Sequence, residues 1–472
     1  MFKVINKIEK GYELNVTLVF EDQVKICEYA SAQNKELIEK LMKKKEFTGK
    51  KGEVLKVEFL EGTYLISMIF VGMGKEESFN LDIYREVMFD VLSKEKGTVL
   101  ISSENEALLD YNVLGEIASN INYSFDTFKE KKDEVLNIEL FIPGEEKDFS
   151  ETVFLGEATD IARDLVDQPA NIINPITLSE KAMELGKEYG FEVEVLDEKE
   201  IEKLGMNLLL AVGKASVTKP RLIVMRYLNG KDNDEKIGLI GKGLTYDTGG
   251  LCIKPADSMF EMKSDMAGAA SVIGAMCAIA KGKLEKNVIA VVPACENAIN
   301  GNAYRPGDII KSMNGKSVEI INTDAEGRLA LADAITYAIR NEKVTEVVDL
   351  ATLTGAILVA LGNITTGVFS NSDEKYAMLE RSSKLYGEKV WRMPIYDEYS
   401  ELLKSTVADI KHTGGRMGGS ITAAKFLESF VEGLPWIHMD IAGTAFNSGI
   451  KWFKKGATGV AVKALYSYVK NR

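Results

Sequence analysis

The sequence predicts an α/β protein whose larger, C-terminal part contains a mostly parallel central sheet. Beyond residue 170, short apolar segments alternate with longer helical patterns, as in parallel sheets that helices cover on both faces. Charged residues that neither pattern explains follow the ends of several apolar segments, and open α/β sheets bind ligands at that edge. The chain has 472 residues. Because one hydrophobic core stops growing at roughly 250–300 residues, we expect more than one domain.

Residues 1–150 are expected to form a small α/β domain. Charged helical patterns at 34–45 and 104–120 lie between apolar runs. These runs, which we interpret as strands, are 13–20, 54–59, 64–71, 97–101 and 135–142. The basic run 40–51 is interpreted as a solvated helix face and turn. No cluster of Asp, Glu, His or Cys with ligand spacing occurs in this part of the sequence, so we expect no metal site there.

A charged, turn-forming joint at 144–148 precedes a connecting helix, which we place at 151–170. Residues 171–472 are expected to form the second domain. Its strands are predicted at 192–196, 222–227, 238–241, 288–292, 318–321, 346–350, 367–370 and 436–441. The helix predicted at 267–280 is apolar nearly all round and should therefore lie in the core.

Composition excludes several classes of protein. The net charge of −13 and the pI of about 5.1 argue against a nucleic-acid or anionic-membrane surface as the main partner. The four cysteines, at 27, 252, 277 and 295, form no CxxC pair and are interpreted as reduced thiols. No apolar signal core follows the first residues, and no apolar run approaches the ~20 residues of a membrane span. We therefore expect a cytoplasmic protein without a membrane partner.

The histidine count constrains any metal site. His412 and His438 are the only two histidines in the sequence, so a zinc site of the His-Glu-x-x-His type is excluded. His438 shares a predicted strand face with Trp436 and Asp440, and we interpret it as a satisfied residue of a buried strand. A metal in this protein must therefore be held mainly by carboxylates.

The octet at 322–329, NTDAEGRL, contains two carboxylates and a guanidinium. It lies between the apolar run 318–321 and a helical pattern that begins near Arg328, which predicts a strand, a tight loop and a helix start. In an extended backbone, Asp324 and Glu326 would point to one side, and paired hard oxygen ligands favour a divalent cation. The alternative is an acidic turn that caps the helix.

A second charged segment lies at 236–265. Lys242 and Asp247 follow a short apolar strand within a Gly-rich loop, and Lys254 and Asp265 come later. The Gly-Lys-Gly sequence lacks the spacing of a phosphate-binding P-loop. Taken singly, Asp265 is a candidate helix N-cap and the lysines are solvated loop residues. Taken together, they leave four charged residues unexplained at one edge of the sheet.

These two segments resemble the leucyl aminopeptidases, also called cytosol aminopeptidases. NTDAEGRL matches the signature octet of that family, and GKGLTYDTGGLCIKP at 241–255 with KSDMAGAA at 263–270 matches its other metal-binding segment. The likeness is strong over 155–472 and loose over the first 150 residues. It continues at 162–171, 293–297, 349–356 and 440–445. The resemblance implies a macro-like N-terminal domain with an assembly role, and a homohexamer.

The resemblance also implies roles for individual residues. One metal ion would be held by Lys242, Asp247, Asp265 and Glu326, and a second by Asp247, Asp324 and Glu326. Lys254 would polarise the scissile carbonyl, and Arg328 would hold a bicarbonate that acts as general base. The pocket for the first side chain of the substrate would be shaped by Met262, Thr352, Leu353, Thr354, Gly355 and Ala442. Ala445 stands where the family often has a larger apolar residue, which leaves the size preference open.

The charges are consistent with this chemistry. Four carboxylates balance two divalent cations, and a metal can depress the pKa of Lys242 so that it ligates as a neutral amine. Lys254 and Arg328 then leave room for an anionic base and a developing oxyanion. Histidine is nearly ruled out as the base and the nearby carboxylates are committed to metals, so Glu296 is the alternative to bicarbonate.

We therefore expect a dinuclear metallo-aminopeptidase that releases neutral, leucine-like residues from peptides. Paired ions can lower the pKa of a bridging water, and a free α-amine with a pKa of ~8 readily ligates a metal. Zinc or manganese is expected, with cobalt or magnesium as alternatives. Two other functions stay open: a two-metal phosphoesterase, and an additional DNA-binding role that the acidic composition disfavours.

Overall fold

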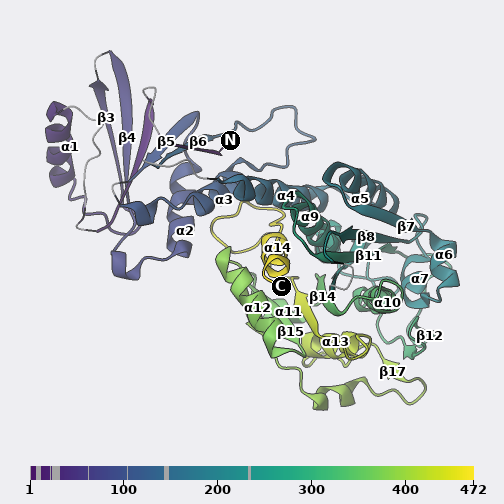
Figure 1. Ribbon diagram of the computed structural model, residues 1–472. Helices are drawn as coiled ribbons and strands as arrows, with labels where there is room; N and C mark the ends of the chain where they lie inside the picture. The colour runs from purple at the N-terminus through teal and green to yellow at the C-terminus, as the bar shows by residue number, and fades with distance from the viewer. Residues whose placement is uncertain are drawn as a thin grey trace. The chain divides into compact units, whose positions relative to one another are not determined.

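The computed structural model describes residues 2–6, 12–21, 23, 32–61, 63–103, 105–142, 148–231 and 235–472. The chain divides into two compact units (Figure 1). The first contains Met1–Glu157 and Lys451–Lys454, and the second contains Ala158–Ile450 and Lys455–Arg472. The division lies inside helix α4 (Ser150–Asp167). Most of the predicted joint, 144–147, and Cys27 lie outside the described residues; Cys252, Cys277 and Cys295 are free thiols, as expected.

The first unit contains a six-stranded sheet in the order β1-β6-β5-β2-β4-β3. Neighbouring strands are parallel except β3 and β4, which are antiparallel. The strands are β1 (Phe2–Ile5), β2 (Leu14–Val19), β3 (Val54–Glu61), β4 (Tyr64–Gly72), β5 (Thr98–Ser102) and β6 (Asn137–Phe141). The helices are α1 (Ala32–Lys44), η1 (Glu76–Ser78), α2 (Leu81–Leu92), η2 (Glu106–Leu108) and α3 (Tyr111–Asn122).

Among the described residues of this unit, a hydrophobic core lies on each face of the sheet, because successive side chains of a strand point to opposite faces. Val16 and Leu18 of β2 pack in one core with α2 and α3, whereas Val19 packs in the other with Ile38 of α1. The lysines of the basic run 40–51 are exposed, as predicted. Strand β1 and helix α2 were not predicted.

The second unit contains a nine-stranded sheet in the order β16-β15-β18-β14-β9-β11-β8-β7, with β10 paired to β11. The inner pairs β18-β14-β9-β11 are parallel, and β8 and β15 run antiparallel to their inner neighbours. This confirms the predicted α/β class with a mostly parallel central sheet. The strands are β7 (Glu192–Leu196), β8 (Arg221–Leu228), β9 (Lys236–Gly241), β10 (Gly243–Asp247), β11 (Asn287–Asn297), β14 (Glu346–Ala351), β15 (Thr365–Ser370), β16 (Lys389–Arg392) and β18 (Trp436–Asp440).

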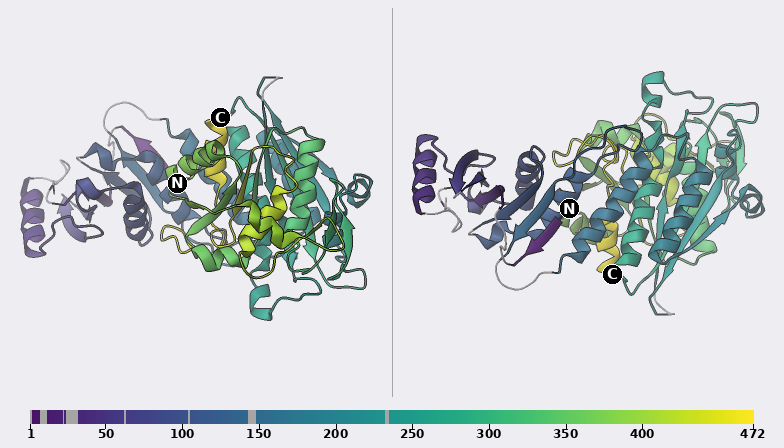
Figure 2. Two further views of the ribbon diagram at one scale, coloured as in Figure 1. Left: turned by 90° about the horizontal axis from the view of Figure 1, so that it is seen from below. Right: turned by 90° about the horizontal axis from the view of Figure 1, so that it is seen from above.

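Helices cover both faces of this sheet (Figure 2). Helices α5, α9, α14 and α12 contact one another in that order, and α6, α7, α10, α13 and α11 form a second such series. Their bounds are α5 (Pro175–Tyr189), α6 (Glu198–Lys203), α7 (Asn207–Gly213), α8 (Ala256–Met259), η3 (Met262–Met266), α9 (Ala267–Lys281), α10 (Gly327–Arg340), α11 (Gly355–Leu361), α12 (Asp373–Leu385), η4 (Asp397–Leu403), α13 (Gly419–Glu428) and α14 (Val462–Lys470). Every residue of α9 from Ala267 to Ala280 is buried, which confirms the predicted core helix.

Two local predictions were wrong. The run 318–321 is not a strand of the central sheet, because β13 (Ser317–Glu319) belongs to a separate three-stranded sheet with β12 (Ile309–Lys311) and β17 (Ile410–Lys411). An apolar run of this length does not specify its partner strands. The predicted loop after Lys242 is instead strand β10, which pairs with β11. Gly243 of β10 lies so close to β11 that a Cβ at this position would be 2.8 Å from Val292 Cγ1.

Within the described part of the chain, no helix is both long enough and apolar enough to cross a membrane.

Candidate metal centre

Lys242 lies where strands β9 and β14 end side by side. Its backbone N–H donates to Leu350 O at 2.9 Å, and its carbonyl accepts from the Ala269 N–H at 2.9 Å. Glycines make this close approach possible: a Cβ on Gly268 would lie 2.2 Å from Leu350 O, and one on Gly241 would lie 2.5 Å from Gly268 O. The backbone of Lys242 therefore joins the carboxyl edge of the sheet to the start of α9.

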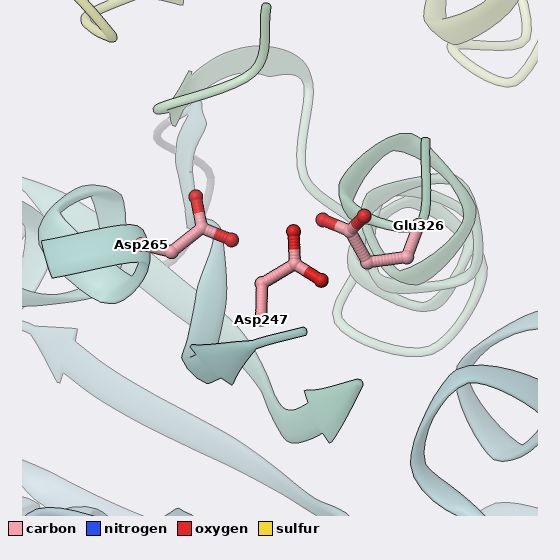
Figure 3. A group of neighbouring side chains, drawn as sticks. All are labelled: Asp247, Asp265 and Glu326. Atoms are coloured by element: carbon pink, nitrogen blue, oxygen red, sulfur yellow. The ribbon is translucent and has the colours of Figure 1, made fainter. Parts of the chain in front are cut away.

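Three carboxylates converge in the site (Figure 3), and Lys242 Nζ lies within 3.1 Å of two of them. Asp247 ends β10, Asp265 lies in η3, and Glu326 directly precedes α10. Each offers an oxygen within 4.8 Å of the others, and all three residues are buried. Asp265 Oδ2 and Glu326 Oε2 are buried without a hydrogen-bond partner. A buried charged oxygen without a partner is costly, so this group fits a cation.

Neither Asp265 nor Glu326 caps its helix. The N-cap position of α9 is Met266, and Glu326 at the N-cap of α10 makes no side-chain capping bond. The alternative interpretation of these acids as helix caps is therefore wrong. Both carboxylates point into the cluster instead.

Two lysines lie among the carboxylates. Lys242 Nζ is 2.8 Å from Asp265 Oδ1 and 3.1 Å from Glu326 Oε1. Lys254 Nζ is 2.9 Å from Asp247 Oδ2 and 2.6 Å from Asp324 Oδ1. Asp324 thus joins the cluster through Lys254. It lies in a turn rather than in the extended segment we expected. These four carboxylates and two ammonium groups leave an excess of negative charge.

The excess charge shifts the acidities of the cluster. Burial, together with the Glu326 and Asp265 charges, raises the pKa of Asp247 to about 8. Burial also raises the pKa of Asp265 to about 6, although Lys242 opposes the shift. For Lys242 itself, burial disfavours the charge, but the Asp265 and Glu326 charges outweigh it and the pKa lies above its usual value. A divalent cation would relieve this repulsion.

A ring of uncharged groups holds the carboxylates in place. Asp247 Oδ1 accepts from the Gly249 N–H at 2.7 Å and from Asn297 Nδ2 at 2.8 Å. Asn297 Nδ2 and the Tyr304 hydroxyl both donate to Thr323 O, at 2.9 and 2.7 Å. Asn297 was not among the predicted site residues, because the strand expected at 288–292 ends well before it, whereas β11 extends to Asn297. The signal was its position directly after Glu296.

Among the described residues, Glu296 is not a member of the carboxylate cluster. It lies within β11 rather than beyond a strand end, and the Ser216 hydroxyl donates to its Oε2 at 2.5 Å. His438 is buried as predicted, with its ring stacked beside Trp436 and its Nδ1 2.5 Å from Asp349 Oδ1.

Arg328 lies in the first turn of α10 and is 6% exposed. Its Nη1 donates to His412 O at 3.0 Å, while its buried Nε has no hydrogen-bond partner. Burial lowers the pKa of Arg328 to about 10. An unpaired guanidinium N–H in a buried position favours an anion.

His412 was not assigned a role by the sequence analysis. Its Nδ1 lies 3.2 Å from both the Ile321 N–H and Glu319 O, and its Nε2 lies 2.8 Å from Asn322 O. These contacts fit a neutral ring that donates through Nε2. Burial, followed by the Arg328 charge, lowers the pKa of His412 to about 4. The residue therefore fixes both the segment that precedes the acidic octet and the Arg328 side chain.

Five of the six predicted pocket residues follow the ends of β14 and β18. Thr352 donates from Oγ1 to Asp265 Oδ1 at 2.8 Å, and its carbonyl accepts from Lys242 Nζ at 3.0 Å. Thr354 caps α11, Gly355 begins it, and Leu353 lies between Thr352 and Thr354. Ala442 follows β18 and is partly exposed, whereas Ala445 is buried. Met262 is partly exposed and begins η3, the 3-10 helix that carries Asp265.

Comparisons with known proteins identify the family of the chain. A model described as "Cytosol aminopeptidase family, catalytic domain" matches residues 160–466, and one for the N-terminal domain of that family matches 18–132. The chain is 45% identical to a "Probable cytosol aminopeptidase" of Fusobacterium nucleatum, over 100% of this chain and 99% of the relative. It is 43% identical to a protein of the same name from Clostridium perfringens, over 100% of each.

Among solved structures, the chain is similar to "Bottromycin maturation enzyme BotP in complex with Mn". The TM-score is 0.86 and the sequence identity is 29%, over 97% of this chain and 99% of the other.

Proposed function

The chain belongs to the cytosol aminopeptidase family and is a metal-dependent aminopeptidase, and we propose that it releases neutral, leucine-like residues from the N-termini of peptides with two divalent ions. The observation that carries this proposal is the cluster of Asp247, Asp265 and Glu326, which includes buried oxygens without partners. Zinc or manganese suits this donor set, and cobalt or magnesium are alternatives.

We assign the ions to two overlapping sets of ligands. Lys242, Asp247, Asp265 and Glu326 would hold one ion, and Asp247, Asp324 and Glu326 the other. Two ions held in this way supply a water of lowered pKa and a Lewis acid for the peptide carbonyl. Thr352 and Asn297 orient the ligands, because each donates to a carboxylate of the cluster.

Two further side chains act on the peptide bond in this proposal. The Lys254 side chain is 16% exposed, and its ammonium contacts both Asp247 and Asp324. It would donate to the carbonyl oxygen of the substrate as negative charge develops there. Arg328 would bind bicarbonate through its unpaired Nε. Bicarbonate would supply a general base, whereas the cluster carboxylates are committed to metal and Glu296 Oε2 accepts from the Ser216 hydroxyl.

The pocket for the first side chain would be formed by the turn 352–355, Met262 and Ala442. Apolar and backbone groups predominate in this set, which supports a preference for neutral side chains. We also propose a cytoplasmic location, which the names of the relatives support, and a homohexamer, which rests on the family resemblance alone. Sedimentation of the purified protein tests the oligomer.

The central experiment uses protein stripped by a chelator and reloaded with zinc, manganese, cobalt or magnesium. Leucinamide should be hydrolysed, whereas N-acetyl-leucinamide, which has no free amine, should not. Hydrolysis of p-nitrophenyl phosphate instead of the amides would favour the phosphoesterase and overturn the proposal. A salt-dependent gel shift at neutral pH would reopen the DNA-binding role.

Asp265→Asn and Asp324→Asn test the assignment of ligands. Each removes one negative charge from the cluster and should cost a bound ion and most of the activity with the fold intact. Elemental analysis decides the matter, because two tightly bound ions per chain in either variant would contradict the assignment.

A further inference from the structure

The turn 352–355 is held from two sides by charged groups. On the metal side, Thr352 contacts Asp265 through its hydroxyl and Lys242 through its carbonyl. On the other side, the Leu353 N–H donates to Asp440 Oδ1 at 3.1 Å, and the Thr354 hydroxyl donates to Asp440 Oδ2 at 2.6 Å. Both carboxylate oxygens of Asp440 therefore accept hydrogen bonds from this segment.

Asp440 lies where it can hold the chain segments after β14 and β18 in place. It is the last residue of β18, pairs in register with Ala351 of β14, and is 1% exposed. Its Oδ1 also accepts from the Ala442 N–H at 3.3 Å. One carboxylate therefore ties together the chain after β14 and the chain after β18. These two segments carry most of the proposed pocket for the first side chain.

The strand that carries Asp440 is anchored by a second polar group. Trp436 Nε1 donates to Asp349 Oδ2 at 2.6 Å, and His438 Nδ1 lies 2.5 Å from Asp349 Oδ1. The His438 ring stacks with Phe369 and with Trp436, at ring-centroid distances of 5.9 and 6.2 Å. Charge-assisted bonds in a fully buried setting are strong and directional, so Asp440 has little freedom to move.

We propose that Asp440 is a positioning residue that sets the wall of the pocket for the first side chain of the substrate. The inference rests on the proposed pocket and deepens it. Asp440 acts through the Leu353 N–H and the Thr354 hydroxyl, and no hydrogen bond or ion pair joins it to the metal-site carboxylates among the described residues. The effect on hydrolysis should therefore depend on the size of the first side chain.

The substitution Asp440→Asn should disturb the hydrogen bond with the Thr354 hydroxyl and leave the other contacts of residue 440 in place. Its carbonyl can still accept from Leu353 and Ala442, but its NH₂ group would face the Thr354 hydroxyl. That hydroxyl accepts from the Ile357 N–H at 3.2 Å as the cap of α11; it could accept from the NH₂ group as well, but its own hydrogen would lose the Asp440 oxygen that now accepts it. The turn should then shift at Thr354, while the contacts of Thr352 with Asp265 and Lys242 remain.

The test compares leucinamide with alaninamide for wild type, Asp440→Asn, Thr354→Val and the double variant. For Asp440→Asn we expect the KM for leucinamide to rise about 10-fold or more, the effect of losing one charge-assisted hydrogen bond. The KM for alaninamide, whose methyl group hardly reaches the wall, should change little, and both ions should stay bound. The double variant should be no worse than Asp440→Asn, since both changes break the same bond.

Asp333→Asn is the matched control. Asp333 is also fully buried and accepts three backbone N–H bonds, from Leu208, Leu209 and Met313. This variant should lower the melting temperature without a size-dependent change in KM. An equal loss on both amides in Asp440→Asn, or an unchanged KM for leucinamide, would overturn the inference.

The inference can still be tested if Asp440→Asn does not fold or if the wild type shows no size preference. Should Asp440→Asn fail to fold, Thr354→Ser and Thr354→Val still decide: the serine keeps the hydroxyl and should have a lower KM for leucinamide than the valine, and equal values would overturn the inference. A wild-type enzyme that does not discriminate leucinamide from alaninamide refutes the proposed pocket, and the inference with it.

Discussion

Gly327 gives the sharpest test of how the metal centre is built. It is the first residue of α10, and a Cβ at this position would lie 2.4 Å from Lys242 Cε and 2.8 Å from Lys242 Nζ. Carbon atoms in contact are ordinarily ~3.5–4.0 Å apart. Gly327→Ala should therefore push the Lys242 side chain aside by about 1 Å.

This substitution should lower turnover but should not lower the stability of the fold. Displacing Lys242 breaks its contacts with Asp265 at 2.8 Å and with Glu326 at 3.1 Å, and a misplacement of about 1 Å can cost on the order of 10²-fold in turnover. Alanine in place of glycine otherwise stabilises the fold by roughly 0.4–1 kcal/mol, because it restricts the unfolded chain. We expect a protein that is as stable as wild type but has lost most of its activity.

The assay measures kcat/KM for leucinamide, bound metal by elemental analysis, and the melting temperature. Gly301→Ala is the control, because nothing lies within 4 Å of a Cβ there, and it should behave as wild type. A Gly327→Ala protein with two bound ions and wild-type turnover would refute the role of Lys242 as a closely packed ligand.

Three further predictions follow from the other charged groups of the site. Lys254→Ala should keep both ions and lose turnover by roughly 10²–10³-fold; loss of metal together with activity would make Lys254 a ligand or a structural residue instead. Activity in carbonate-free buffer should rise when bicarbonate is added, and Arg328→Ala should abolish that rise while both ions stay bound. No response of the wild type would make Glu296 the first alternative base. His412 is neutral and buried, with a pKa of about 4 against an ordinary 6.5, so its contribution to stability should be complete above pH 6.5 and lost as the pH falls toward 4. Because a shift of one unit corresponds to about 1.4 kcal/mol, this contribution is on the order of 3 kcal/mol. Urea unfolding at several pH values should show a shallower acid loss in His412→Asn, and identical pH slopes would count against this explanation.

The class of the fold was predictable because it depends on patterns that extend over the whole chain. The alternation of strands and helices gave the parallel strands β9, β11, β14 and β18, all of which lie close to their predicted positions. Short edge strands such as β12, β16 and β17 carry few residues and no strong apolar pattern. Their existence depends on partners that are far away in sequence, so they were missed.

At the site, residue types were easier to predict than their geometry. The sequence pointed to Asp247, Asp265 and Glu326, and the structure brings these three together. The argument for Asp324 and Glu326 assumed an extended backbone, whereas the chain turns at Asp324. Asn297 and His412 were not identified, because their importance comes from hydrogen bonds to the loops at the site rather than from any local motif.

The separate three-stranded sheet has a consequence for how the protein opens. Asp247 is carried by the central sheet, whereas Asp324 lies on the segment between β13 and α10. Ions bound by both residues would act as a non-covalent cross-link between two parts that are distant in sequence, and would stabilise the folded form by about 2.7 kcal/mol at a concentration 100 times the Kd. Amide hydrogen exchange in β12, β13 and β17 should then slow on loading with metal, so that exchange in this small sheet would report on occupancy of the metal site.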